Sequence, residues 1–160
     1  DDKNLPVKAG EPGEVTITTL GVEGMPLLRF KTGDICYQYT EPCACGRNTI
    51  RLSSVLGRKG QMIKYKGTTL YPPALFDILD DIPRVKNYVV EVYTNKLGTD
   101  EILIRIGSDE NSESFAKEIK DIFRSKIRVA PTIRFEPAEY ISQIQMPPMS
   151  RKSIKFFDLR

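Results

Sequence analysis

The stretch that decides the fold is KNYVVEVYTNKLGTDEILIRIGS, residues 86–108. It holds two runs in which apolar and polar residues alternate, KNYVVEVYT and EILIRIGS. This period of two is typical of strands with one buried face. The intervening NKLGTD carries the glycine and polar residues of a turn. We therefore expect two strands of one small sheet, joined by a short turn.

Helical patterns stand on either side of this strand pair. SFAKEIKDIFRSKI (114–127) places apolar side chains at intervals of three and four, which predicts an amphipathic helix. ALFDILDDI (74–82) has similar spacing and follows two prolines, which suit a first helical turn. TIRFEPAEYI (132–141) predicts a further strand. Residues 59–160 are therefore expected to form a small α+β domain, a β-hairpin plus a three-stranded sheet with two helices.

The first 58 residues carry strand signals and no helical pattern. GEVTITTLG (13–21) alternates, LLRFKTGDICYQY (27–39) is rich in β-formers, and EPG and ACGRN break the strands. So small an all-β piece buries little core of its own. We expect residues 1–58 to be the β-rich end of a larger domain. The chain starts without a methionine, and we expect it to be a fragment of a longer protein.

Composition argues against several classes of protein. Of the 160 residues, 40% are hydrophobic and 28% are charged, as in ordinary soluble domains. No apolar run approaches the ~18 residues of a membrane span, and the polar start shows no secretion signal. The net charge of +3 comes from interleaved acids and bases, so we expect no nucleic-acid partner. The absence of histidine removes Ser-His and Cys-His catalysis within this chain.

The three cysteines, Cys36, Cys43 and Cys45, lie close together in a C-x6-C-x-C pattern. An odd number in one short segment is not a secreted disulfide framework, so we expect a reducing, cytoplasmic setting. A Cys43–Cys45 disulfide is not expected, because one intervening residue strains its geometry. The pattern could present sulfurs to zinc, with a fourth ligand from Glu41, water or another domain. Reduced thiols in a loop are the alternative.

Two short motifs carry the residue types of a nucleotide site. In RFKTGD, Asp34 is expected at a strand-to-loop turn, where its carboxylate could accept two hydrogen bonds from a ribose diol. It could equally satisfy turn amides. In GRKGQMIKYKG (57–67), Arg58 could contact ribose or phosphate, and Gly67 could let a ligand approach the backbone. The alternative for that stretch is a plain hairpin with solvated lysines.

In their order and spacing, RFKTGD, the CxCGR segment, GRKGQMIKYKG and the terminal RKSIKFFDLR resemble the adenylate-forming enzyme superfamily. Within it, the chain resembles the C-terminal part of phenylacetate-CoA ligases over essentially its whole length. The resemblance implies an acid-thiol ligase that uses MgATP to activate a carboxylic acid, here an aryl or arylacetic acid, and then transfers the acyl group to coenzyme A. It also implies a large N-terminal domain and a small C-terminal domain, residues 59–160 here, that rotates between the two half-reactions.

The resemblance assigns roles to single residues. Asp34 matches the residue that holds the ribose hydroxyls, and Arg58 the neighbouring nucleotide contact. Gly60 falls at the hinge, and Gly67 matches the glycine that lines the pantetheine channel. Lys152 matches the lysine that the C-terminal domain inserts for adenylation, where an ammonium stabilises the charge that develops as two anions meet.

Two positions depart from the family's pattern. The hinge usually has an acidic residue or lysine where this chain has Gly60, so the charge that biases the two states is absent. The residue before the adenylation lysine is commonly glycine and is Arg151 here, which adds a second cation. The resemblance also implies that the acid pocket and the phosphate loop belong to the N-terminal domain, so we expect no ligase activity from these 160 residues alone.

A function of a different class is also compatible with these residues. The chain could be a non-catalytic α+β binding module with a zinc knuckle at the cysteines and a basic tail that touches nucleic acid. Bound zinc and a salt-sensitive affinity for nucleic acid would distinguish this alternative.

Overall fold

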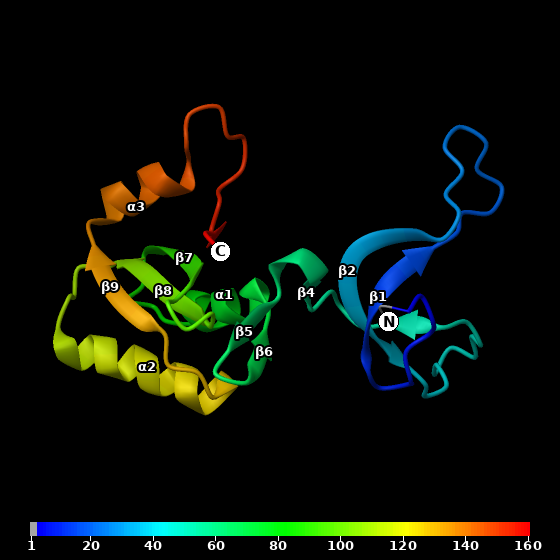
Figure 1. The fold of residues 1–160 in the computed structure, drawn as a ribbon, viewed down its shortest axis with the longest axis horizontal. Helices are drawn as coiled ribbons and strands as arrows, with labels where there is room; N and C mark the ends of the chain where they lie inside the picture. Colours follow the sequence, from blue (N-terminus) through cyan, green and yellow to red (C-terminus); the bar gives the residue numbers. More distant parts are fainter. Residues whose placement is uncertain (1–2) are drawn as a thin grey trace. The chain divides into compact units, whose positions relative to one another are not determined.

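The computed structural model of the protein describes residues 3–160. The chain divides into two compact units, one that ends at Met62 and one that spans Ile63–Arg160 (Figure 1). The expected domain boundary, between residues 58 and 59, falls just before this division. Within the described residues, no helix combines the length and apolar character needed to cross a membrane.

The unit Ile63–Arg160 is built on a hairpin of two long strands, β7 (Asn87–Thr94) and β8 (Asp100–Gly107), paired antiparallel along their length (Figure 1). The predicted alternation is confirmed, because alternate side chains of both strands are buried on one face of the sheet. These side chains are Tyr88, Val90, Val92, Ile102, Ile104 and Ile106. Full burial of one large apolar side chain contributes roughly 1.5–3 kcal/mol, so this face supplies much of the unit's stability.

The two predicted helices contribute to the same core. α1 (Pro72–Asp80) begins with a proline, which needs no backbone N–H at that position. α2 (Glu113–Ile127) begins where the hydroxyl of Ser112 accepts a hydrogen bond from the backbone N–H of Phe115. The buried side chains of the two helices are Leu75, Ile78, Leu79, Phe115, Ile119 and Phe123.

The α+β class is confirmed, but the sheet and helix counts differ from the expected three strands and two helices. Within the described chain, this unit has a four-stranded sheet in the order β10-β7-β8-β9 and three helices. The expected strand at 132–141 is β9 only as far as Glu136 (Thr132–Glu136), and α3 (Ala138–Gln145) follows. Pro137 lies between them and has no N–H for the ladder. Figure 1 draws α3 on the side of the sheet away from α2.

The fourth strand comes from the terminal tail. β10 (Phe156–Asp158) pairs in parallel with β7, and Phe156 faces Val90 in the register. Phe156 also packs against the core. The tail was missed as a strand because three residues carry almost no periodic signal, and the pairing partner lies far away in the sequence.

The hairpin predicted within residues 59–72 is formed by β5 (Ile63–Tyr65) and β6 (Thr68–Leu70). Lys66 and Gly67 make its two-residue turn, with φ of 47° and 82°. Positive φ at both central positions is the signature of a type I′ turn, whose twist matches that of the flanking strands. Gly67 therefore has a backbone role that a residue with a Cβ fulfils only under strain.

The first unit is a small β structure, as expected. Its strands are β1 (Pro12–Ile17), β2 (Phe30–Tyr39), β3 (Arg51–Leu52) and β4 (Gly57–Arg58), followed by a 3-10 turn at Lys59–Gln61. β2 pairs antiparallel with each of the other three strands. Among the described residues of this unit, only Ile35 and Cys36 are buried hydrophobic side chains, so its own core is minimal.

Replacing Gly67 with alanine should destabilise the unit Ile63–Arg160 by about 1–2 kcal/mol, because an L-residue in the left-handed region is strained. Gly60→Ala is the matched control: its added Cβ also meets open space, and its φ is not positive. Urea unfolding followed by circular dichroism should give a lower midpoint for Gly67→Ala and a midpoint near that of the parent for Gly60→Ala. Equal shifts in the two variants would contradict the turn assignment.

Candidate nucleotide and adenylation site

Asp34 and Arg58 lie opposite each other on neighbouring strands of the first unit, as register partners of the β2–β4 pair. The Nε of Arg58 is 3.3 Å from the Oδ1 of Asp34. The Arg58 side chain is 69% exposed and that of Asp34 is 29% exposed, so a solute can reach both. The structure thus brings these two predicted site residues together, as an open carboxylate acceptor beside a guanidinium donor.

The expectation that Asp34 stands at a strand-to-loop turn is wrong, because the residue lies inside β2. β1 and β2 pair at Thr16–Lys31 and again at Glu14–Ile35, so three residues of β2 oppose one residue of β1. The glycine of the motif, with a φ of 78°, allows this bulge. Bulges commonly re-aim a side chain.

Thr32 is a site residue that the sequence reasoning missed. Its hydroxyl accepts a hydrogen bond from the backbone N–H of Asp34 at 3.1 Å and donates one to the carbonyl of Val15 at 3.3 Å. The two bonds tie the bulge to β1 and fix the backbone that carries Asp34. The signal was present in RFKTGD, since a threonine two residues before an aspartate has the spacing of a side-chain turn.

Gly60 lies in the 3-10 turn Lys59–Gln61, just before the division between the two units. The preceding residue, Lys59, pairs with Glu14 of β1, with 3.2 Å between Nζ and Oε2. No atom lies within 4 Å of the position that a Cβ on Gly60 would take. Packing therefore does not require glycine at this point.

Lys152 is exposed in the loop that runs from α3 to β10, which Figure 1 shows leaving the end of α3 and returning to the sheet. The hydroxyl of Ser150 donates to the Lys152 carbonyl at 2.6 Å and lies 3.4 Å from its backbone N–H. In the part of the chain that the structure describes, no ion pair or hydrogen bond of the Lys152 ammonium is found. Such an ammonium is free to meet an anionic ligand.

Gly67 and Lys152 belong to the same unit. Asp100 hydrogen-bonds to the strand before the Gly67 turn and to the chain end that follows the Lys152 loop. The Oδ2 of Asp100 accepts a hydrogen bond from the backbone N–H of Lys64, in β5, at 2.8 Å. It also accepts one from the Nη1 of Arg160, two residues after β10, at 2.9 Å. The Asp100 side chain is only 13% exposed, so this carboxylate joins the two segments away from bulk water.

Arg160 also pairs with the carboxylate of Asp158, the last residue of β10. Its Nη2 is 2.6 Å from the Oδ2 of Asp158, and this hydrogen bond lowers the pKa of Asp158. The same two carboxylates raise the pKa of Arg160, so the guanidinium stays charged. The D-x-R of the terminal motif therefore forms an ion pair at the C-terminal end of β10.

The structure does not bring the three predicted metal ligands together. The Sγ atoms of Cys43 and Cys45 are 3.0 Å apart, whereas Cys36 is buried in β2. The hydrogen bond from Cys43 lowers the pKa of the Cys45 thiol, and burial raises the pKa of the Cys36 thiol. Within residues 3–160, no group of three or more His, Cys, Asp or Glu side chains could hold a metal ion. The described residues therefore do not form a structural zinc site of three or four protein ligands.

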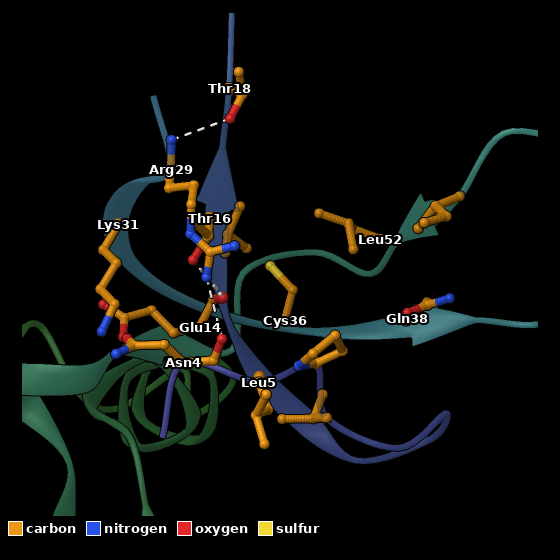
Figure 2. A pocket seen from close by; sticks show the side chains of 15 residues that line it. Asn4, Leu5, Glu14, Thr16, Thr18, Arg29, Lys31, Cys36, Gln38 and Leu52 are labelled. Carbon is orange, nitrogen blue, oxygen red and sulfur yellow. Dashed lines mark hydrogen bonds between the residues drawn. The ribbon is translucent and has the colours of Figure 1, made fainter. Parts of the chain in front are cut away.

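A hollow of about 760 Å³ opens in the first unit against β1 and β2 (Figure 2). Arg29 lies at its wall, with its guanidinium donating to the carbonyl of Asn4 at 3.2 Å and its backbone N–H donating to the hydroxyl of Thr18 at 3.0 Å. Lys31 also lines the hollow and adds a second cation. The Asp34–Arg58 pair is not part of this lining, so the hollow is a separate feature.

Curated relatives of the chain carry the name phenylacetate-coenzyme A ligase. The protein from Thermus thermophilus is 36% identical over 118 residues, which cover 74% of this chain and 26% of that protein. The protein from Aromatoleum evansii is 26% identical over 133 residues, 78% of this chain and 30% of that protein. The protein from Escherichia coli K12 is 22% identical and covers 97% of this chain. The chain spans about a quarter to a third of the length of these relatives. No family model matches it.

Solved structures give the same fold. A crystal structure of 2-hydroxyisobutyryl-CoA ligase, in a postadenylation state with an acyl-AMP, matches 96% of this chain with 33% of its own length. The TM-score is 0.73 and the identity 20%. The amide bond synthetase McbA from Marinactinospora thermotolerans covers 86% of this chain with a TM-score of 0.58 and 15% identity. At these identities the likeness concerns the fold.

The resemblance that the motifs predicted is therefore confirmed by sequence and by structure. The chain is related, over most of its length, to part of the phenylacetate-coenzyme A ligases, and it has the fold of one part of the adenylate-forming CoA ligases.

Proposed function

We propose that the chain is the C-terminal part of an ATP-dependent, AMP-forming ligase, which activates an aryl or arylacetic acid as an acyl-adenylate and transfers it to coenzyme A. The observation that carries this proposal is the open Asp34–Arg58 pair, which the RFKTGD bulge holds in a chain similar to such ligases. The aryl or arylacetic acid is taken from the names of the relatives. The cytoplasmic location is taken from the free thiols.

Asp34 and Arg58 divide the recognition of a nucleotide between them. A carboxylate can accept hydrogen bonds from both hydroxyls of a ribose, and charge-assisted bonds of this kind are the strong ones. A guanidinium beside it can donate to ribose or to a phosphate oxygen. In the structure the two groups bind each other at 3.3 Å. Nucleotide binding would exchange that ion pair, which is weak at so exposed a place, for bonds to the ligand.

Lys152 supplies the positive charge for adenylation. When a carboxylate attacks the α-phosphorus and pyrophosphate leaves, negative charge accumulates at the reacting centre, and a positioned ammonium stabilises it. The ammonium in the loop before β10 is exposed and has no partner among residues 3–160, so it is suited to this role. Arg151 beside it is a second exposed cation.

The two units correspond, in this proposal, to the end of the large adenylation domain and to the mobile C-terminal domain. The first unit exposes large apolar side chains: Leu20, Met25 and Leu28 are 88%, 71% and 81% exposed. This exposure supports the proposal that the first unit packs against the rest of a larger domain. Gly60, at the end of that unit, would be the hinge, and Gly67, in the second unit, would line the channel for coenzyme A. The zinc-knuckle alternative gains no support from the described residues.

Changing Lys152 to alanine in the complete gene product should lower the rate of ATP–pyrophosphate exchange by about 10²–10³, since one charge-stabilising donor is removed. Thioester formation from a supplied acyl-adenylate should proceed as in the parent, because that step does not use the lysine. Arg151→Ala is the neighbouring control and should retain most of the exchange rate. Equal loss of both half-reactions in Lys152→Ala would contradict the assigned role.

Changing Asp34 to alanine should raise the KM for ATP, because the ribose hydroxyls lose their carboxylate acceptor. Loss of a charge-assisted hydrogen bond corresponds to about 10–100-fold in KM for ATP. With 2′,3′-dideoxy-ATP, parent and variant should have nearly equal KM values, because the partner of the carboxylate is absent. If the ratio of variant to parent KM were the same for ATP and for 2′,3′-dideoxy-ATP, Asp34 would not act on the ribose hydroxyls.

The isolated chain of 160 residues should catalyse no ATP–pyrophosphate exchange with any aryl acid. Joining it to the polypeptide encoded upstream should produce exchange, because the proposal assigns the acid pocket and phosphate loop to that part. Exchange by the isolated chain, or an upstream reading frame without a phosphate-loop domain, would count against the proposal.

A further inference from the structure

Lys155 follows Lys152 by three residues, and its ammonium is engaged on several sides. Its Nζ lies 3.2 Å from the Oδ1 of Asp80 and 3.0 Å from the phenol oxygen of Tyr88. The same ammonium lies over the rings of Tyr88 and Phe76, 4.7 Å and 5.9 Å from their centroids. Among the residues that the structure describes, the Lys152 ammonium has no partner and the Lys155 ammonium has several.

The partners of Lys155 also hold one another. The hydroxyl of Tyr88 donates to the Oδ1 of Asp80 at 2.8 Å. Burial and this hydrogen bond raise the pKa of Tyr88, so the phenol keeps its proton. Asp80 is the last residue of α1, and Tyr88 belongs to β7. The cluster thus joins a helix, the central strand and the residue that precedes β10.

Backbone bonds close the loop at the same place. The N–H of Ile154 donates to the carbonyl of Gln145, at the end of α3, at 2.8 Å. The side-chain amide of Gln145 donates to the carbonyl of Tyr88 at 2.7 Å, and the N–H of Val90 donates to the carbonyl of Lys155 at 2.9 Å. Both ends of the loop 146–154 are therefore attached to β7.

The side-chain cluster matters because the strand it supports is short. β10 has three residues, and so short an edge strand has few backbone bonds to hold its position. A single exposed ion pair would add little, as with Lys126 and Asp81, whose Nζ and Oδ2 are 2.7 Å apart on the open surface. Lys155 differs because one ammonium meets a carboxylate, a phenol and two aromatic faces at once.

We propose that Lys155, together with Asp80 and Tyr88, positions the loop 146–154 so that the Lys152 ammonium reaches the reacting phosphate in productive geometry. This inference rests on the proposed function. Lys155 does not touch the reacting atoms in this scheme; it acts through the base of the loop that carries Lys152. Such support affects rate strongly, since a displacement of about 1 Å in a catalytic group can cost on the order of 10²-fold.

The test uses the complete gene product with Lys155→Met, which keeps the apolar stem and removes the ammonium. The kcat for ATP–pyrophosphate exchange should fall about 10–100-fold, with an unchanged KM for ATP, because the nucleotide contacts stay in place. Thioester formation from a supplied acyl-adenylate should be unchanged. Asp80→Asn should lower kcat in the same direction. Lys155→Arg should recover most of the rate, since it keeps the charge and can stack on the rings.

Asp81→Asn is the matched control, because it breaks the neighbouring surface ion pair on the same helix end and should leave kcat unchanged. Amide hydrogen exchange at Ile154 gives a readout independent of activity and should be faster in Lys155→Met. An unchanged kcat in Lys155→Met overturns the inference, and so does an equal loss of both half-reactions with a lower melting temperature. Lys152→Ala is measured in parallel. If it leaves exchange intact, the proposed function fails; if it alone lowers exchange, only the positioning role fails.

Discussion

Burial of one face of the β7–β8 hairpin is the constraint on which the unit Ile63–Arg160 depends. Alternate residues of both strands are withdrawn from water by α1, α2 and the β5–β6 hairpin. The alternation fixes the register, since a slip of one residue would turn Glu91 and Arg105 into the core. Instead these two side chains pair with each other on the opposite face, 2.8 Å apart and mostly shielded from solvent. β9, β10 and α3 contact these two strands directly.

The candidate chemistry lies at the margins of that framework. The Gly67 turn is the tip of the small hairpin, and Lys152 lies in the loop that leads to the edge strand β10. Functional groups on loops held by a rigid sheet are common, because the sheet supplies position and the loop supplies access. In the first unit, Asp34 and Arg58 are likewise held by paired strands, and a bulge in β2 exposes the Asp34 carboxylate.

Sequence periodicity predicted the elements that bury a continuous apolar stripe: β7, β8, α1 and α2. It failed where the determining contact is distant or non-periodic. β10 exists because Phe156 has a partner strand some sixty residues earlier, and no local pattern encodes that pairing. α3 was missed because Pro137 redirects the chain after β9. The motifs identified Asp34, Arg58 and Lys152 as residues of interest. The bulge, the threonine that holds it and the Lys155 cluster depend on contacts between distant residues, so only the three-dimensional structure reveals them. The cysteine pattern alone could not show that Cys36 lies apart from the other two.

If the chain belongs to a ligase as proposed, the hydrogen bonds of Asp100 bear on the order of that enzyme's two half-reactions. One shielded carboxylate accepts hydrogen bonds both from the strand before the Gly67 turn and from Arg160, two residues after the end of β10. Any rigid movement of the unit therefore carries the turn and the lysine loop through the same angle. In the proposed ligase, withdrawing the lysine and presenting the thiol channel are then one displacement, so the steps exclude each other without a separate signal to switch between them.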